Sequence, residues 1–349
     1  MYKCKVAFPV DMTPFEGHIS VLLPDLAEAF ESNSRIKERI FGVISRGSFQ
    51  GVKLTSDRRR LVTPKCDLET KQILLDEGFL SYLWCLCCFI IGLVDMTNDK
   101  VLEHPNANIA RLSDHEWYRL FDATLGWGRS LRDEYSPWPD YIPNPSQDSE
   151  LVRHTNTLWI FAVRSFMYHE LGHLAMHSCS LQLILDYKDK PDIVSSADLR
   201  RLHNMEIQAD DYALDSLLLS DVNEYERYLK YLGFVTAYIG TFYLLPNGDT
   251  RSADFHPDLD TRLQTLLKKV SGLNEYYSTL LKHTTNLGLQ VFFAFGIGFT
   301  EGRRDSTYQD FGDLLNDLLS EVGHLKARYE EHDAIARAKR KPTVSWTSG

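Results

Sequence analysis

One stretch, His169–His173, which reads HELGH, constrains this chain more than any other. It lies in a segment whose apolar spacing predicts a helix from about Leu158 to His177. Residues four apart on an α-helix project from the same face, so both imidazoles can point at one ion. Glu170 lies about 100° round the helix from His169, where its carboxylate can reach a water molecule bound to that ion. The pattern therefore predicts a catalytic metal site with Glu170 as the general base.

The histidine pair needs a third ligand, because catalytic zinc takes three protein ligands and keeps one coordination position open. In metzincins the pattern would continue with glycine at position 176 and histidine at position 179, but this chain has Met176 and Cys179. Cys179 is not needed as a ligand, because Glu206 follows on a second predicted helix. The predicted ligands of a Zn²⁺ cofactor are His169, His173 and Glu206.

The second helix is predicted from Ser196, its N-cap, to Leu217. Glu206 and Asp210 share a face, and the small side chain of Ala209 nearby lets this helix approach the histidine helix closely. Asp210 is placed to accept the second ring N–H of a ligand histidine and so to orient that ring. Asp211 is the alternative for this role, because either aspartate could face inward.

Hydrolysis also needs a hydrogen-bond donor for the oxyanion that forms when water attacks a carbonyl. The candidates are His256, Tyr212 and Arg262, whose alternative roles are a helix cap, a packed aromatic ring and a salt-bridge partner. We assign His256 and Tyr212 to catalysis, and place Arg262 with Asp210 among the side chains that support the ligands. His177, two turns beyond the first histidine, is expected to be a polar core partner, because a fourth protein ligand would close the site.

At this point the chain resembles known families. HELGH with the downstream ExxAD of Glu206–Asp210 is similar to the gluzincin zinc metallopeptidases, and His256-Pro257 followed by Arg262 resembles a block of their HtpX-like branch. The phrases HELGHLAMH and EIQADDYALDSLL are also similar to the ImmA/IrrE-type peptidases and to the phage-exclusion Lit peptidase family. The resemblance covers roughly Phe166–Leu266. It implies a mainly α fold with a small strand content, in which a zincin-like HExxH helix packs on the ExxAD helix.

Composition limits the partners and the compartment. The 349 residues are 44% hydrophobic and 25% charged, which is typical of a globular protein that buries its own core. The net charge of -10 argues against a nucleic-acid partner held by phosphate contacts. The six cysteines show no regular spacing, which favours a reducing compartment, and no signal peptide is recognised. We therefore expect a cytoplasmic protein.

Three runs without charged residues are candidates for membrane spans: Phe79–Val94, Tyr231–Gly248 and Thr284–Thr300. Each is at or below the roughly 18 to 20 residues that a span needs. The last two also contain threonine and several glycines. These features favour buried core helices over membrane spans.

Four prolines between residues 137 and 145 form a stiff loop just before the histidine helix. Such a loop serves either as a domain boundary or as a lip of the substrate cleft. We divide the chain into residues 1–147, a mainly helical region and a candidate cleft wall, and residues 148–349, the catalytic region with the C-terminal helices. The first region is expected to hold a short strand at residues 2–8 and a helix from Asp67 to Val94.

The sequence as a whole predicts a cytoplasmic zinc endopeptidase that acts on a specific protein target through water activated by Glu170. The resemblance to the Lit and ImmA/IrrE groups implies a role in phage exclusion or stress. One alternative is a non-catalytic, zinc-containing interaction protein, against which the presence of Glu170 argues. The other alternative is a membrane-associated, HtpX-like housekeeping protease.

Overall fold

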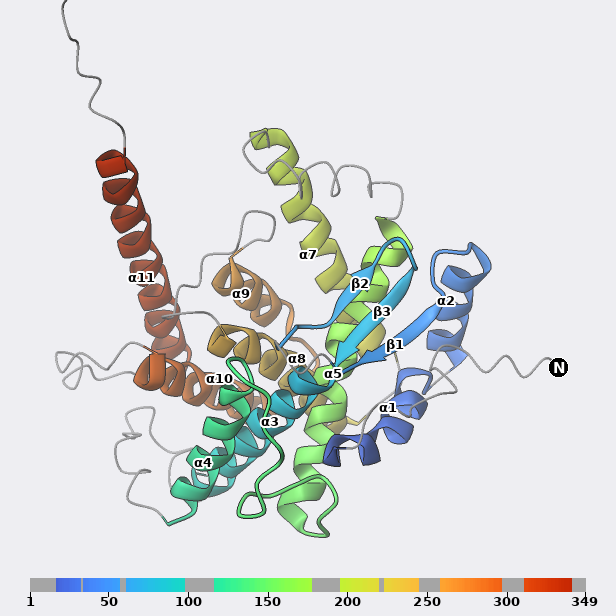
Figure 1. Cartoon of the computed structure of the whole chain (residues 1–349), viewed down its shortest axis with the longest axis horizontal. Coiled ribbons are helices and arrows are strands. Elements are labelled where there is room, and N and C mark those ends of the chain that lie inside the picture. The colour runs from blue at the N-terminus through green and yellow to red at the C-terminus, as the bar shows by residue number, and fades with distance from the viewer. Residues whose placement is uncertain are drawn as a thin grey trace, which may run out of the picture.

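The computed structural model describes residues 17–32, 34–56, 61–97, 116–177, 195–219, 223–244, 258–296 and 311–340. This part of the chain is mainly helical with one small sheet (Figure 1), which confirms the predicted fold class. The strand expected at residues 2–8 lies outside the described residues. The elements in chain order are η1 (His18–Leu22), α1 (Leu23–Phe30), α2 (Ser34–Ser45), β1 (Gly51–Thr55), β2 (Lys65–Asp67), β3 (Gln72–Asp76), α3 (Glu77–Thr97), α4 (Glu116–Ser130), α5 (Glu150–Met176), α7 (Ser196–Leu218), α8 (Glu224–Leu244), α9 (Leu259–Lys269), α10 (Glu275–Gly296) and α11 (Phe311–Arg340).

The sheet has three strands in the order β1-β3-β2, with β1 parallel and β2 antiparallel to β3. Strand β2 therefore lies at one edge of the sheet, and it packs beside α5. Residue 66 pairs with residue 73 of β3 in the antiparallel register.

The expected helix from Asp67 to Val94 is wrong in its first third, where β2, a turn and β3 precede α3. Two aspartates in this stretch bond nearby backbone N–H groups and so interrupt the expected helix. The Asp67 carboxylate accepts hydrogen bonds from the backbone N–H groups of Glu69 (3.0 Å) and Thr70 (3.2 Å). Asp76 then accepts the N–H of Phe79 at 3.1 Å, so it starts α3. Short polar side chains compete with the helix in this way by bonding nearby backbone groups.

Helix α5 is the central element, and it packs against α3, α7, α8 and the sheet (Figure 1). It begins at Glu150, about two turns earlier than the apolar spacing suggested, because the Ser149 hydroxyl caps it by accepting the N–H of Val152 at 3.2 Å. Its middle and C-terminal turns are buried on nearly all sides. A helix buried on all sides lacks a polar face, so its apolar periodicity is weak at sequence level.

Helices α5 and α7 pack tightly against each other at the HELGH stretch. A Cβ atom placed on Gly172 would lie 3.2 Å from the Cα of Ala209 and 3.2 Å from the Cβ of Tyr212. Only glycine at position 172 therefore lets the two helices pack this tightly. The N-cap of α7 is Ser195 and not the predicted Ser196, since the Ser195 hydroxyl accepts the N–H of Asp198 at 3.2 Å. The predicted packing of the HExxH helix on the ExxAD helix is present.

Among the described residues one helix, α3, is long and apolar enough to cross a membrane. Its apolar side chains are buried inside the protein, where α3 packs against α4, α5 and α8. Burial of this kind is typical of a core helix in a soluble protein.

The proline-rich loop is fixed at the N-terminal end of α5, through Trp138. The Trp138 ring lies 4.6 Å from that of Trp127 and 5.4 Å from that of Trp84, centroid to centroid. The Trp84 indole N–H donates to the Oδ1 of Asn156 at 2.7 Å. Asn156 precedes His169 by several turns, which is about 20 Å along a helix. This position argues against the loop as a lip of the metal site, and the division of the chain at residue 147 stays a prediction.

Candidate metal centre

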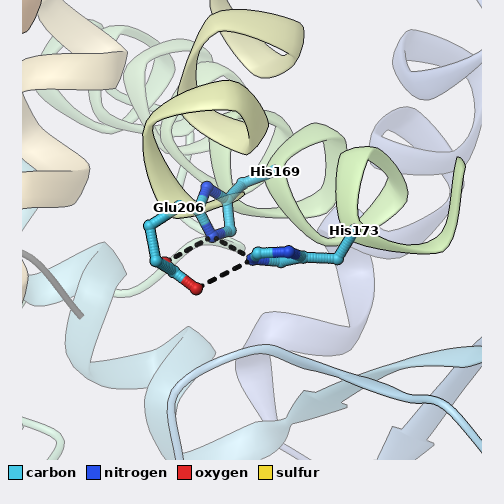
Figure 2. A group of neighbouring side chains, drawn as sticks. All are labelled: His169, His173 and Glu206. Carbon is cyan, nitrogen blue, oxygen red and sulfur yellow. Dashed lines mark hydrogen bonds and ion pairs between the residues drawn. The ribbon is translucent and has the colours of Figure 1, made fainter. Parts of the chain in front are cut away.

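Three predicted ligands, His169, His173 and Glu206, point toward one another between α5 and α7 (Figure 2). The Nε2 atoms of the two histidines are 3.1 Å apart. The Glu206 carboxylate places Oε1 3.1 Å from the Nε2 of His173 and Oε2 3.4 Å from the Nε2 of His169. All three side chains are buried.

This arrangement fits a tetrahedral metal ion. Ligand atoms about 2.1 Å from a tetrahedral zinc ion lie about 3.4 Å from one another. Here one ligand atom from each of the three residues lies within 4.8 Å of the other two, and the two Nε2 atoms are 3.1 Å apart. Two imidazoles and one carboxylate are a ligand set of catalytic zinc sites. The group of His169, His173 and Glu206 could therefore hold a metal ion.

The outer side of His169 faces an ion pair. Its Nδ1 lies 2.8 Å from the Oδ1 of Asp210. Arg262 of α9 binds the same carboxylate with two hydrogen bonds, from Nη2 at 2.6 Å and from Nε at 2.8 Å. The Nη1 of Arg262 also lies 3.6 Å from the Oε2 of Glu206. Asp210 therefore orients His169, and Arg262 orients Asp210 in turn.

The charges of this cluster shift its pKa values strongly. Burial lowers the pKa of His169, but hydrogen bonds to Asp210 and Glu206 outweigh burial and raise it to about 10. Burial would raise the pKa of Asp210, yet the Arg262 guanidinium and His169 hold it well below its usual range. The carboxylates of Asp210 and Glu206 therefore favour a positive charge on His169.

The outer ring nitrogen of His173, Nδ1, has no charged partner like Asp210 among the described residues and instead meets a histidine and, through it, an amide. This Nδ1 lies 3.0 Å from the Nδ1 of His177, and the Nε2 of His177 lies 3.1 Å from the Oε1 of Gln208 on α7. His177 thus contacts a predicted ligand from outside, as the expected polar core partner. Gln208 carries no signal in the sequence that would single it out.

The general-base candidate Glu170 is held by the sheet. Its Oε2 accepts the backbone N–H of Cys66, in edge strand β2, at 2.6 Å. This N–H points away from β3, toward α5. Burial and the neighbouring Glu170 carboxylate both raise the pKa of the Cys66 thiol, so the thiol is neutral. Nothing in the sequence connects Cys66 with the site, since Cys66 and Glu170 are far apart in the chain.

The other predicted site residues do not all lie beside the candidate ligands. Asp210, not Asp211, faces inward, and Asp211 forms a surface ion pair with Lys269. Tyr212 lies on another face of α7, where its ring packs under the guanidinium of Arg39 at 4.7 Å and contacts the backbone near Gly172. His256 lies outside the described residues. The catalytic roles of Tyr212 and His256 stay predictions.

Comparison with known proteins was made on the whole chain. Residues 73–280 match the sequence model of the family described as Peptidase U49. The matched segment is more than half of the chain and runs from β3 into α10, so it includes every predicted ligand. Comparisons with curated proteins and with solved structures gave no match.

Proposed function

Because the chain belongs to the peptidase U49 family, the Lit-like peptidases, which supports a proteolytic function, we propose that it is a zinc-dependent endopeptidase with a specific protein target. The family match confirms the resemblance to the Lit group. The similarity to gluzincins and to the ImmA/IrrE-type and HtpX-like branches stays a prediction.

The observation that carries this proposal is the convergence of His169, His173 and Glu206, whose ligand atoms lie within 4.8 Å of one another, with Glu170 next to His169 in the sequence. Zinc held by these three side chains would polarise the peptide carbonyl and make its bound water more acidic. With zinc bound there, Glu170 would be the group that takes a proton from the attacking water and gives it to the leaving amine. The Cys66 N–H occupies Oε2 of Glu170, which leaves Oε1 as the atom that carries the proton.

The surroundings support the rest of the proposal. The four described cysteines, Cys66, Cys85, Cys87 and Cys88, are free thiols, as expected in a reducing compartment. The burial of α3 favours a cytoplasmic enzyme over a membrane-associated housekeeping protease. The partner of this enzyme is a protein or peptide substrate, and the Lit-like family suggests a role in phage exclusion or stress.

The test compares wild type with Glu170→Gln, both loaded with zinc. The amide has nearly the shape of the carboxylate but cannot accept the proton, so we expect zinc and fold to be retained and cleavage to fall by at least about 100-fold. Cleavage is measured by labelling the new N-termini that appear in a cell lysate. Equal numbers of new N-termini for both proteins would contradict the proposal: at the level of a lysate without enzyme they favour the non-catalytic zinc protein, and above that level they remove Glu170 as the base.

A further inference from the structure

The outer nitrogen of His173 leads into a short chain of hydrogen bonds. This chain runs from the Nδ1 of His173 to the Nδ1 of His177, 3.0 Å away, and from the Nε2 of His177 to the Oε1 of Gln208, 3.1 Å away. His177 is the C-cap residue of α5, and it is buried. Gln208 stands two residues after Glu206 on α7. These hydrogen bonds therefore connect α5 and α7, the two helices that carry the ligands.

The directions of these hydrogen bonds follow from the donors and acceptors. An amide oxygen can only accept, so the Nε2 of His177 carries the proton that Gln208 receives. A neutral His177 then has a lone pair on Nδ1, and the proton between the two rings belongs to the Nδ1 of His173. A neutral His173 is left with a lone pair on Nε2, the atom that faces His169 and Glu206.

That lone pair is what a metal ion requires. A histidine that binds a metal through Nε2 must carry its proton on Nδ1 and needs an acceptor for it. His169 finds this acceptor in a charged group, Asp210 with Arg262. His173 finds it in the neutral pair of His177 and Gln208. The amide oxygen of Gln208 and a metal ion at the Nε2 of His173 therefore require the same direction of proton donation, from His173 to His177 to Gln208.

We propose that His177 and Gln208 are positioning residues, which fix His173 in the tautomer and the orientation that present its Nε2 to the metal. This inference rests on the proposed zinc function. Gln208 is the end of the chain that sets its direction, because a donor in place of the amide oxygen would reverse both hydrogen bonds. A reversed chain puts a proton on the Nδ1 of His177, which then cannot accept from His173.

The test uses this dependence on direction. Glu at position 208 can only accept and keeps the direction, whereas Lys can only donate and reverses it. Asn204 supplies the matched control, because it stands two residues before Glu206 as Gln208 stands two after, and both side chains are exposed. Asn204→Glu and Asn204→Lys thus introduce the same charges on the same helix without touching the chain of hydrogen bonds.

Zinc affinity is measured by competition with a chromophoric chelator. We expect Gln208→Glu to bind zinc at least as tightly as Asn204→Glu, and Gln208→Lys to bind about 10-fold or more weakly than Asn204→Lys. In addition, long-range ¹H–¹⁵N spectra of the zinc-loaded wild type should show the His177 proton on Nε2. A His177 proton on Nδ1, or equal affinities for the two Lys variants, would overturn the proposal.

These outcomes are separate from those of the proposed function. A wild-type protein that binds zinc but cleaves nothing would refute the endopeptidase and leave the positioning role to be judged on affinity and tautomer. A wild-type protein that binds no zinc would refute both. Because both substituted positions are exposed, we expect the variants to keep the fold. Their melting temperatures check this.

Discussion

Arg262 is the residue whose removal the structure makes easiest to quantify. Its side chain is 13% exposed, and its guanidinium forms two hydrogen bonds with Asp210, whose side chain is 15% exposed, and also faces Glu206. Arg262→Met would keep most of the aliphatic stem, but would remove the charge and the guanidinium that lies over the Tyr238 ring. Two buried carboxylates would then lose their shared arginine. Removing one partner of a buried ion pair costs about 3 to 5 kcal/mol, and the partial exposure of this pair argues for about 3 kcal/mol.

The metal changes this cost. A bound dication next to Glu206 and His169 supplies positive charge to the same carboxylates, so the loss of Arg262 matters less when zinc is present. We therefore expect Arg262→Met to lower the free energy of unfolding by about 3 kcal/mol in chelator-treated protein, and by clearly less at saturating zinc. Urea unfolding followed by fluorescence measures both values.

Lys269→Met is the matched control. Lys269 lies on the same helix, α9, and pairs with Asp211 on the same partner helix, but this pair is exposed. A surface ion pair contributes about 0 to 1 kcal/mol. If Arg262→Met in the metal-free protein costs no more than Lys269→Met, then the buried cluster does not depend on the arginine and the reasoning fails.

The remaining predictions concern the third ligand, the helix contact and acid stability. Glu206→Ala should reduce zinc from about one ion per chain to a small fraction of that in metal analysis, and tight stoichiometric zinc would show that the third ligand is wrong. Gly172→Val should cost about 1 to 3 kcal/mol by overpacking against Ala209, with weaker zinc binding, whereas Gly42→Val, which has open space, should not weaken zinc binding. Burial lowers the pKa of His283 to about 4. Because this folded-state pKa lies below the unfolded value of about 6.5, the stability from neutral His283 is present above pH about 6.5 and is lost as pH falls toward 4. The loss amounts to about 3 kcal/mol, and urea unfolding of His283→Gln should show a flatter pH dependence over that range. An unchanged slope would refute this.

The sequence predicted the part of the site that local spacing determines. His169 and His173 lie one turn apart on a helix, and Glu206 and Asp210 lie one turn apart on another, so each pair could be placed on one face before the fold was known. The small side chain of Ala209 predicted a close helix contact, whereas the need for glycine at position 172 is visible only in the structure. Local spacing could not decide between Asp210 and Asp211, because this choice depends on where Arg262 lies.

The contacts that the sequence did not predict come from distant segments or from competing local structure. Cys66 reaches Glu170 only because β2 forms the edge of a sheet that packs beside α5. Gln208 is an ordinary exposed helix residue until the position of His177 is known. The error at Asp67 has a different origin, since an aspartate before a helical pattern can cap a helix or close a turn. The hydrogen bonds that decide between the two are visible only in the structure.

The ligands of the proposed metal come from two helices, so a bound ion would link these helices to each other. An ion held by His169 and His173 of α5 and by Glu206 of α7 is a cross-link between segments that the chain joins only through the connection between Met176 and Ser195. By the loop-entropy relation used for disulfides, closing a loop of roughly 33 residues stabilises the folded state by about 4 kcal/mol. A protease cut within that connection would leave two fragments joined by the ion and by helix packing alone. The metal would then serve as a removable cross-link, and a chelator would weaken the association of the two halves of a nicked molecule.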